Sequence, residues 1–161
     1  MANLNDSWSL DREVVLVRLL NHPRAKVFAA WMNPEALAKW YGPAGLAIEN
    51  HEADIREGGV WRFDMVGNFE GQEQRFPNLM RFLEVVENER IVADYGTPDA
   101  DDPDRFRFTI TFDEQADGKT VLTMRQLHPT PERRKAVIDF GAVEYGLQTL
   151  DGLDTWLNEN V

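Results

Sequence analysis

The chain has 161 residues, no cysteine, and a hydrophobic fraction of 43% that includes nine Phe and five Trp. This length and composition exclude a disordered chain and predict one domain with a sizeable core over residues 1–161. The formal net charge of −11, from 28 acidic and 17 basic residues, argues against nucleic acid or an anionic membrane surface as a partner.

The sequence shows no recognisable targeting or membrane-spanning segment. Met1 to Asp6 contains no basic patch followed by an apolar run, which is the pattern of a secretory signal. No apolar stretch approaches the roughly 18 residues that cross a membrane. Because the chain also lacks cysteine, we expect a cytoplasmic protein without disulfides or thiolate metal ligands.

One strand and two short helices are expected first along the chain. Glu13–Leu20 is rich in β-branched residues whose faces alternate, which is typical of a strand. After Pro23 the apolar residues follow helical spacing, and Asn33-Pro34-Glu35 begins a second short helix. The turn at Gly42–Gly45 ends this region.

From Leu46 to Leu127 the apolar pattern changes to strict alternation, which indicates strands joined mostly by hairpins. Gly67–Arg75 is predicted to be a polar connection and Thr97–Asp104 an acidic loop. The expected strands are Leu46–Ile55, Val60–Val66, Phe76–Glu87, Arg90–Tyr95, Arg105–Phe112 and Thr120–Leu127.

The last stretch, Thr130–Asn160, is predicted to form a single long helix. Thr130 can cap its first N–H groups, and Pro131 suits the first helical position. Apolar residues then recur at three- and four-residue spacing to the carboxyl end. A helix of about 28 residues is roughly 40 Å long, so a large surface has to cover it.

This order of elements predicts an α+β fold. Strands linked by hairpins, with helices at the two ends, are typical of an antiparallel sheet with helices on one side. The apolar face of that sheet is the one surface large enough to cover the long helix. We therefore expect a curved sheet of about seven strands wrapped round the C-terminal helix, with two short helices after the first strand.

Short motifs spread over Arg12–Leu157 occur in a fixed order. They are Arg18 with Pro23, Phe28-x-x-Trp31-x-x-Pro34, Trp40-Tyr41-Gly42-Pro43, Gly58-Gly59-x-Trp61-Arg62-Phe63, Glu84-x-Val86-x-x-x-Arg90-Ile91-Val92, Gly118-x-Thr120-x-Leu122, and Gly146-x-x-x-Leu150-x-x-Leu153-x-x-Trp156-Leu157. In order and spacing the chain resembles the activator-of-heat-shock-chaperone-ATPase-like branch of the START, polyketide-cyclase and birch-pollen-allergen superfamily. The resemblance implies the fold called the helix grip.

The resemblance also implies a cavity between the sheet and the C-terminal helix. An aromatic and methionine lining of such a cavity suits a small hydrophobic or aromatic ligand. The alternative is that these side chains pack against one another in a solid core. The residues expected on the wall are Trp40, Trp61, Phe63, Met65, Met80, Phe82, Tyr95, Phe106, Phe108, Met124, Phe140, Val143 and Leu147.

Two polar residues are further candidates for the ligand-binding set. Asn78 is in phase with Met80 and Phe82, so we expect it to point inward, where a ligand oxygen or water would satisfy it. His51 lies in the middle of a strand. One register places it in the cavity beside Tyr95, where it would relay protons, and the other places it in solvent.

Metal and covalent chemistry have little support in the sequence. No predicted helix carries a His-x-x-x-His or Glu-x-x-His pair, and His22 and His128, which both precede proline, are expected in connections. The carboxylates of Asp99–Asp104 lack the glycine turn and the closing glutamate of a helix-loop-helix calcium site. We therefore expect no metal, no cofactor and no catalytic residue.

Three functions are compatible with the sequence. The favoured one is binding of a small hydrophobic or aromatic molecule in the cavity, without covalent chemistry. The second is a cyclase or hydratase that uses the same cavity through His51 and Tyr95. The third, implied by the family name, is a module that stimulates a chaperone ATPase, with its acidic surface meeting a basic protein partner. The sequence is also compatible with a homodimer.

Overall fold

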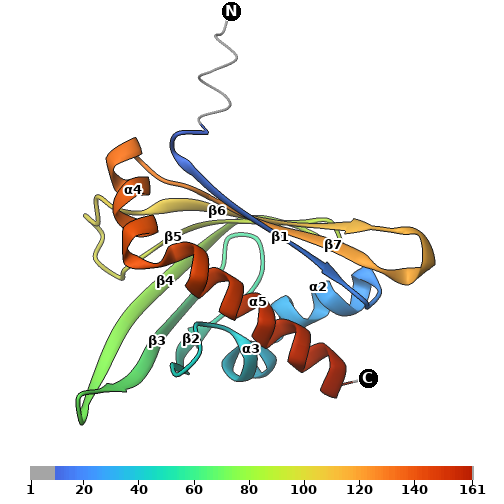
Figure 1. Ribbon diagram of the computed structural model, residues 1–161, viewed down its shortest axis with the longest axis horizontal. Coiled ribbons are helices and arrows are strands. Elements are labelled where there is room, and N and C mark those ends of the chain that lie inside the picture. Colours follow the sequence, from blue (N-terminus) through green and yellow to red (C-terminus); the bar gives the residue numbers. More distant parts are fainter. Residues whose placement is uncertain (1–9, 161) are drawn as a thin grey trace, which may run out of the picture.

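A seven-stranded antiparallel sheet with the strand order β1-β7-β6-β5-β4-β3-β2 forms the frame of the molecule (Figure 1). The computed structural model describes residues 10–160. The strands are β1 (Glu13–Leu20), β2 (Ala47–Ala53), β3 (Val60–Phe69), β4 (Gln72–Val86), β5 (Arg90–Gly96), β6 (Phe106–Glu114) and β7 (Thr120–Leu127). The helices are α2 (Arg24–Met32), α3 (Pro34–Trp40), α4 (Pro131–Phe140) and α5 (Ala142–Glu159), with a 3-10 turn, η1 (Ala116–Gly118), between β6 and β7. The predicted α+β helix-grip class is confirmed.

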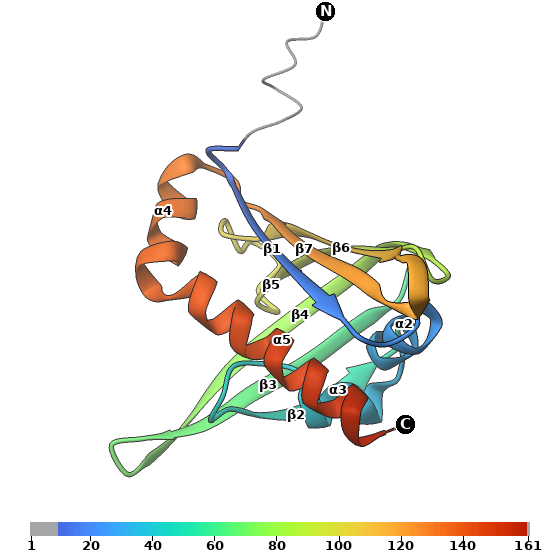
Figure 2. The ribbon, with the colours of Figure 1, turned by 45° about the vertical axis from the view of Figure 1, so that its right-hand side comes forward.

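The two short helices after the first strand are also present. The side-chain oxygen of Asn33 accepts hydrogen bonds from the N–H groups of Glu35 and Ala36, and Pro34 occupies the first turn of α3. The same Asn33 therefore ends α2 and begins α3. Both helices lie beside the C-terminal part of α5 (Figure 2).

Strands β3 and β4 are longer than the sequence predicted. Residues 67–75, expected to be a polar connection, continue both strands to a tight turn at Glu70 and Gly71, whose φ angles are 53° and 80°. The rings of Phe69 and Phe76 pack edge to face, with centroids 6.0 Å apart. The hairpin projects beyond the rest of the sheet (Figure 2). Its sequence lacks a clear alternation because this end of the hairpin meets water on both faces.

The prediction of one continuous C-terminal helix is wrong, because the chain forms two helices separated by Gly141. Gly141 has φ 118° and ψ 21°, in the left-handed region, and its N–H donates to the carbonyls of Val137 and Ile138, which ends α4. None of the ten residues of α4 is fully buried. Helix α5 has 18 residues; neither it nor any other helix within residues 10–160 is long and apolar enough to cross a membrane.

Helix α5 approaches its neighbours very closely at two glycines. A Cβ added to Gly152 would lie 2.6 Å from the carbonyl oxygen of Trp40, and one added to Gly146 would lie 2.3 Å from Leu16 Cδ1. A larger residue at Gly152 would require movement of the Trp40 backbone, whereas one at Gly146 would require movement of the Leu16 side chain. This approach buries a row of leucines, namely Leu150, Leu153 and Leu157.

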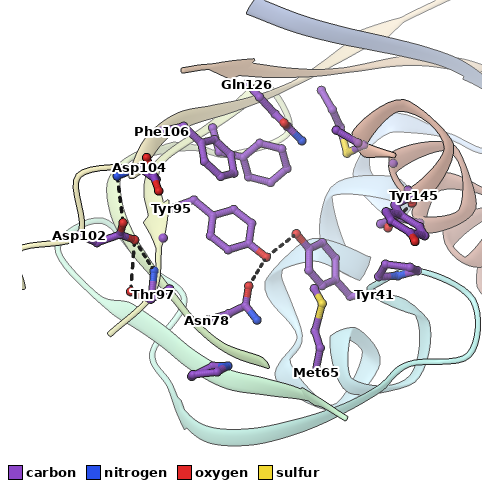
Figure 3. A pocket seen from close by; sticks show the side chains of 18 of the residues that line it. Tyr41, Met65, Asn78, Tyr95, Thr97, Asp102, Asp104, Phe106, Gln126 and Tyr145 are labelled. Carbon is purple, nitrogen blue, oxygen red and sulfur yellow. Dashed lines mark hydrogen bonds between the residues drawn. The ribbon is translucent and has the colours of Figure 1, made fainter. Parts of the chain in front are cut away.

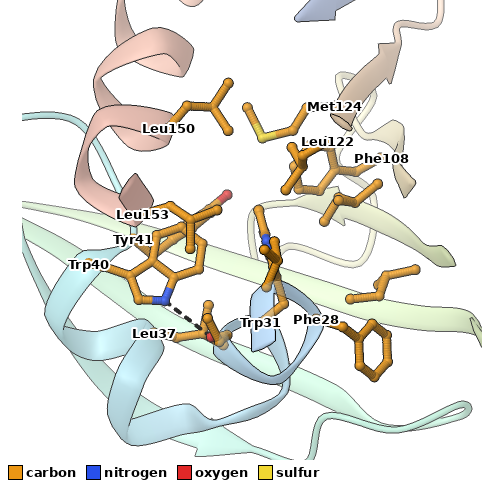
Figure 4. Close-up of a cluster of buried hydrophobic side chains, with 14 of the residues drawn as sticks. Phe28, Trp31, Leu37, Trp40, Tyr41, Phe108, Leu122, Met124, Leu150 and Leu153 are labelled. Carbon is orange, nitrogen blue, oxygen red and sulfur yellow. Dashed lines mark hydrogen bonds between the residues drawn. The ribbon is translucent and has the colours of Figure 1, made fainter. Parts of the chain in front are cut away.

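Aromatic side chains fill one end of the space between α5 and the sheet (Figure 4). The ring of Trp31 from α2 lies 4.8 Å from Trp40, 5.9 Å from Tyr41 and 6.4 Å from Phe108, measured between centroids. Such tilted and edge-to-face pairs are the favoured geometry for aromatic packing. The core is therefore solid at the end where α2 and α3 lie.

Replacing Gly152 with alanine tests the close approach of α5. Alanine in a helix interior usually stabilises it relative to glycine by about 1 kcal/mol. Here the new methyl group would meet the Trp40 carbonyl, so we expect a net loss of about 2 kcal/mol. The measurement is the urea midpoint at unchanged m-value. The matched control is Thr155→Ala at an exposed position of the same helix, which should not destabilise; a more stable G152A variant would contradict the packing described.

Candidate functional site

A cavity of about 350 Å³ lies between the concave face of the sheet and the first turns of α5 (Figure 3). Strands β3 to β7 contribute its floor. Its sides are formed by the connection from α3 to β2, by the loop between β5 and β6, and by one residue of α4. The cavity is at the opposite end of α5 from the aromatic core.

Strand alternation supplies the apolar wall of the cavity. Met65 on β3, Tyr95 on β5, Phe106 and Phe108 on β6 and Met124 on β7 all point from the sheet into it. The ring of Tyr95 lies 5.0 Å from that of Phe106 and 5.6 Å from that of Phe108. These five residues and Asn78 are the predicted lining residues that the structure brings to the cavity.

A chain of hydrogen bonds joins three polar side chains on the wall (Figure 3). Asn78 Nδ2 donates to the carbonyl of Phe76 at 2.8 Å, and Asn78 Oδ1 accepts from the Tyr95 hydroxyl at 2.9 Å. The Tyr41 hydroxyl donates to the Tyr95 oxygen over 3.4 Å, which is long for a bond between hydroxyls. The chain therefore ends at the Tyr41 oxygen, which can still accept a hydrogen bond.

Both tyrosines of this chain keep their protons near neutral pH. Burial raises the pKa of Tyr95, and the hydrogen bond from Tyr41 lowers it by less. Burial also raises the pKa of Tyr41 well above its ordinary value, and the neighbouring Tyr95 adds to this shift. The wall is thus uncharged here and acts through hydrogen bonds rather than through a phenolate.

The loop between β5 and β6 brings two carboxylates to the rim of the cavity. Asp102 accepts hydrogen bonds from the N–H and hydroxyl of Thr97, at 2.9 and 3.2 Å, and from the N–H of Asp104 at 2.9 Å. Burial acts to raise the pKa of Asp102, but these bonds and the nearby Arg105 outweigh it and lower that pKa. From α4, Arg133 Nε lies 3.6 Å from Asp104 Oδ1.

His128 supports the wall from behind, a role that its position before proline did not predict. Its side chain is 1% exposed, its Nε2 lies 3.1 Å from Gln126 Oε1, and its ring centroid is 4.9 Å from that of Phe106. Burial, with a smaller contribution from the charges of Arg133 and Arg134, lowers the pKa of His128 to about 4. The imidazole is therefore neutral at neutral pH.

Five predicted lining residues lie in the packed core instead of the cavity. Trp61 and Phe63 stack with centroids 3.9 Å apart, and the void beside Trp61, Met80 and Phe82 holds only about 10 Å³, the size of one water. The Trp40 indole donates to a backbone carbonyl in α2 at 3.1 Å. At this end of α5 the solid-core alternative describes the packing.

Three residues predicted on the helix side do not line the cavity. Phe140 is 78% exposed and Leu147 38% exposed, whereas Val143 is partly buried against the core. The prediction treated Phe140 as part of the same helix as the other two, but Gly141 starts a new one. The face of α5 that does line the cavity carries smaller or more polar residues: Ala142, Tyr145, Gly146 and Thr149.

His51 takes the solvent register. Its Nε2 lies 3.0 Å from Asp64 Oδ2 on the outer face of the sheet, and this hydrogen bond is the main cause that lowers the pKa of Asp64. A β-bulge between Asn50 and Glu52 shifts the local pairing of β2 with β3. The proton relay between His51 and Tyr95 is therefore not formed.

Several lining residues were missed by sequence reasoning. Tyr41 had a usable signal, because it follows Trp40 at the end of the second predicted helix, where the backbone becomes extended and turns the next side chain inward. The residues of the loop between β5 and β6 had no usable signal in the sequence, because their positions depend on the hydrogen bonds of Asp102. The missed residues outside α5 are Tyr41, Pro43, Pro77, Gly96, Thr97, Asp102, Asp104, Gln126 and Arg133.

The fold and the cavity define a helix-grip protein of the START, polyketide-cyclase and birch-pollen-allergen type, a fold that commonly binds hydrophobic ligands. The model of the family described as "Activator of Hsp90 ATPase homolog 1-like protein" matches residues 21–158. The chain belongs to this family. A search of proteins with curated functions gives no match.

Solved structures of bacterial proteins have the same fold. Protein NE0264 from Nitrosomonas europaea is 25% identical, with a TM-score of 0.80 over 93% of this chain and 96% of that one. Protein CV1439 from Chromobacterium violaceum is 26% identical, with a TM-score of 0.72 over 89% and 95%. Protein Ms6760 from Mycobacterium smegmatis, at 20% identity, has a TM-score of 0.81 over 94% of each chain. The shared fold thus covers nearly the whole length of these proteins.

The buried His128 predicts a specific loss of stability in acid. Its pKa falls from an ordinary 6.5 to about 4 on folding, so between these values the unfolded chain binds more protons and stability rises with pH. The stability that comes from burying a neutral His128 is fully present above pH 6.5. As the pH falls toward 4, the free energy of unfolding decreases by about 2–3 kcal/mol. The free energy of unfolding by urea is measured across this pH range for wild type and for His128→Phe. We expect it to fall less steeply with decreasing pH in the variant. Parallel pH curves for the two proteins would contradict the assignment.

Proposed function

We propose that the protein binds a small hydrophobic or aromatic molecule in the cavity beneath α5. The observation that carries this proposal is an apolar wall combined with a hydrogen-bonded chain, Tyr41–Tyr95–Asn78, around about 350 Å³ of space. Small-molecule sites commonly have volumes of about 300–1,000 Å³ and apolar walls, with a few polar groups that orient the ligand. The cavity matches this description in size and in chemistry.

The wall divides into groups with different roles. Phe106, Phe108 and Met124 offer ring faces and a flexible thioether to an apolar ligand body. The Tyr41 oxygen, at the end of the hydrogen-bonded chain, offers a fixed acceptor. Such an arrangement favours a flat ligand with a polar atom at one end.

The geometry favours binding over the cyclase or hydratase alternative. That alternative required His51 next to Tyr95, and His51 is instead bonded to Asp64 on the outer face of the sheet. Tyr95 and Tyr41 have raised pKa values and hold their protons. The groups brought together on the wall therefore supply shape and hydrogen bonds, not the expected proton relay.

Filling the cavity should weaken ligand binding. Ala142 lines it, and in Ala142→Phe the new ring would occupy the ligand's space. We expect affinity for naphthalene-methanol, measured by isothermal titration calorimetry, to fall by at least about tenfold. The matched control is Ala136→Phe on the exposed surface of α4, which should bind as the wild type does. Equal affinities in both variants, with unchanged circular dichroism, would contradict the proposed site.

Removing the polar anchor should affect only ligands with a polar end. In Asn78→Leu the Tyr95 hydroxyl loses its acceptor, so the orientation of the Tyr41 hydroxyl is no longer fixed. We expect about three- to tenfold weaker binding of naphthalene-methanol, the size of one lost hydrogen bond, and unchanged binding of naphthalene. Calorimetry with both ligands checks this; an equal loss for the two would indicate damage to the wall as a whole.

The family description supports a second role, stimulation of a chaperone ATPase. The net charge of −11 would attract a chaperone surface that is basic. Under this role ATPase stimulation depends on the outer surface, so the Ala142→Phe variant should stimulate as well as wild type. Stimulation that disappears in this variant would assign the effect to the cavity instead.

A further inference from the structure

The charged groups at the rim of the cavity indicate the sign of the ligand. Of the residues within 10–160 that line it, Arg133 is the one cation, whereas Asp102 and Asp104 are both acidic. Arg133 Nε lies 3.6 Å from Asp104 Oδ1, so these two opposite charges offset each other, and with Asp102 the three groups sum to a charge of −1. Because the chain carries a net charge of −11, the long-range field also attracts positive rather than negative molecules.

The two tyrosines on the cavity wall offer no free donor to an anion. A carboxylate needs hydrogen-bond donors, but the hydroxyl proton of Tyr95 is committed to Asn78 and that of Tyr41 is directed at Tyr95. Raised pKa values keep both phenols neutral. The free capacity at the end of the chain is the Tyr41 oxygen, which is an acceptor.

The aromatic rings of the wall also favour a positively charged ligand. Tyr95, Phe106 and Phe108 place three rings with centroids between 5.0 and 6.3 Å apart. Of these, Tyr95 and Phe106 lie next to the loop that carries Asp104 (Figure 3). Aromatic faces attract an ammonium group within about 6 Å of the ring centroid. A cation at the rim would therefore meet both ring faces and a carboxylate.

We propose that the cavity takes an organic cation, an aromatic or alkyl amine in its ammonium form. The hydrocarbon part would pack against Phe108 and Met124, and the ammonium group would lie between the ring of Phe106 and the carboxylate of Asp104. This inference rests on the proposed function and goes beyond it by naming the charge of the ligand and the rim residue that selects it.

Three ligands of the same ring and different charge test the inference. Naphthalene-methylamine, naphthalene-methanol and naphthalene carboxylate are titrated into the wild-type protein at low salt, and the dissociation constants are compared by calorimetry. We expect the ammonium to bind about tenfold more tightly than the alcohol, and the carboxylate to bind most weakly. Added salt should narrow these differences, because it screens the charges at the rim.

Two rim substitutions should change ammonium binding in opposite directions. Asp104→Asn removes the selecting carboxylate and should weaken ammonium binding about two- to fivefold. Arg133→Gln removes the cation that is paired with this carboxylate and should tighten ammonium binding by a similar factor. Asp101→Asn is the matched control, because it removes one charge from the same loop at a residue that does not line the cavity. It should leave ammonium affinity nearly unchanged.

The outcomes separate this inference from the proposed function. If the carboxylate binds most tightly, or Arg133→Gln weakens ammonium binding, the cation inference is overturned and the cavity remains a ligand site. Equal binding of all three ligands also overturns it, since charge then plays no part. If none of the three binds, the proposed function itself fails.

Discussion

The close approach of α5 to the chain beneath it determines the rest of the structure. At Gly152 the helix backbone comes so near the carbonyl of Trp40 that a Cβ would lie 2.6 Å from the oxygen, and at Gly146 it reaches Leu16 equally closely. These two contacts fix α5 against α3 and against β1. The leucines of the helix are thereby buried, and the distance between helix and sheet is set along the whole concave face.

The cavity exists because the two ends of that concave face are filled differently. Where α2 and α3 lie, Trp31 and Trp40 occupy the space. At the other end α5 presents Ala142 and Thr149 to the space, and neither side chain is large enough to fill it. The left-handed Gly141 then ends α4, a helix with no fully buried side chain. The space is thus a consequence of small side chains and a helix break rather than of the large residues around it.

The elements that sequence could predict are those whose signal is local. Strand alternation identified the inward residues of β6, and Asn33-Pro34-Glu35 identified the start of α3. The break at Gly141 was missed because apolar spacing continues on both sides of it. The cavity-lining face of α5 was missed for a different reason, since pattern reasoning selects large apolar residues and this face bears small or polar ones. Asp104 reached the rim through loop hydrogen bonds that have no periodic signal.

The polar chain on the wall satisfies its own hydrogen-bonding groups and leaves one acceptor for the proposed ligand. A buried polar group without a partner costs about 1–3 kcal/mol, but Asn78 and Tyr95 are paired with each other at 2.9 Å and Asn78 also bonds to the backbone. The bond from Tyr41 is the long one, at 3.4 Å. In the proposed binding mode a ligand would donate to the free Tyr41 oxygen. It would therefore leave the bonds of the chain intact, including the one that holds Tyr95 in place against Phe106. On this proposal, the same three side chains would both orient the ligand and stabilise the empty wall.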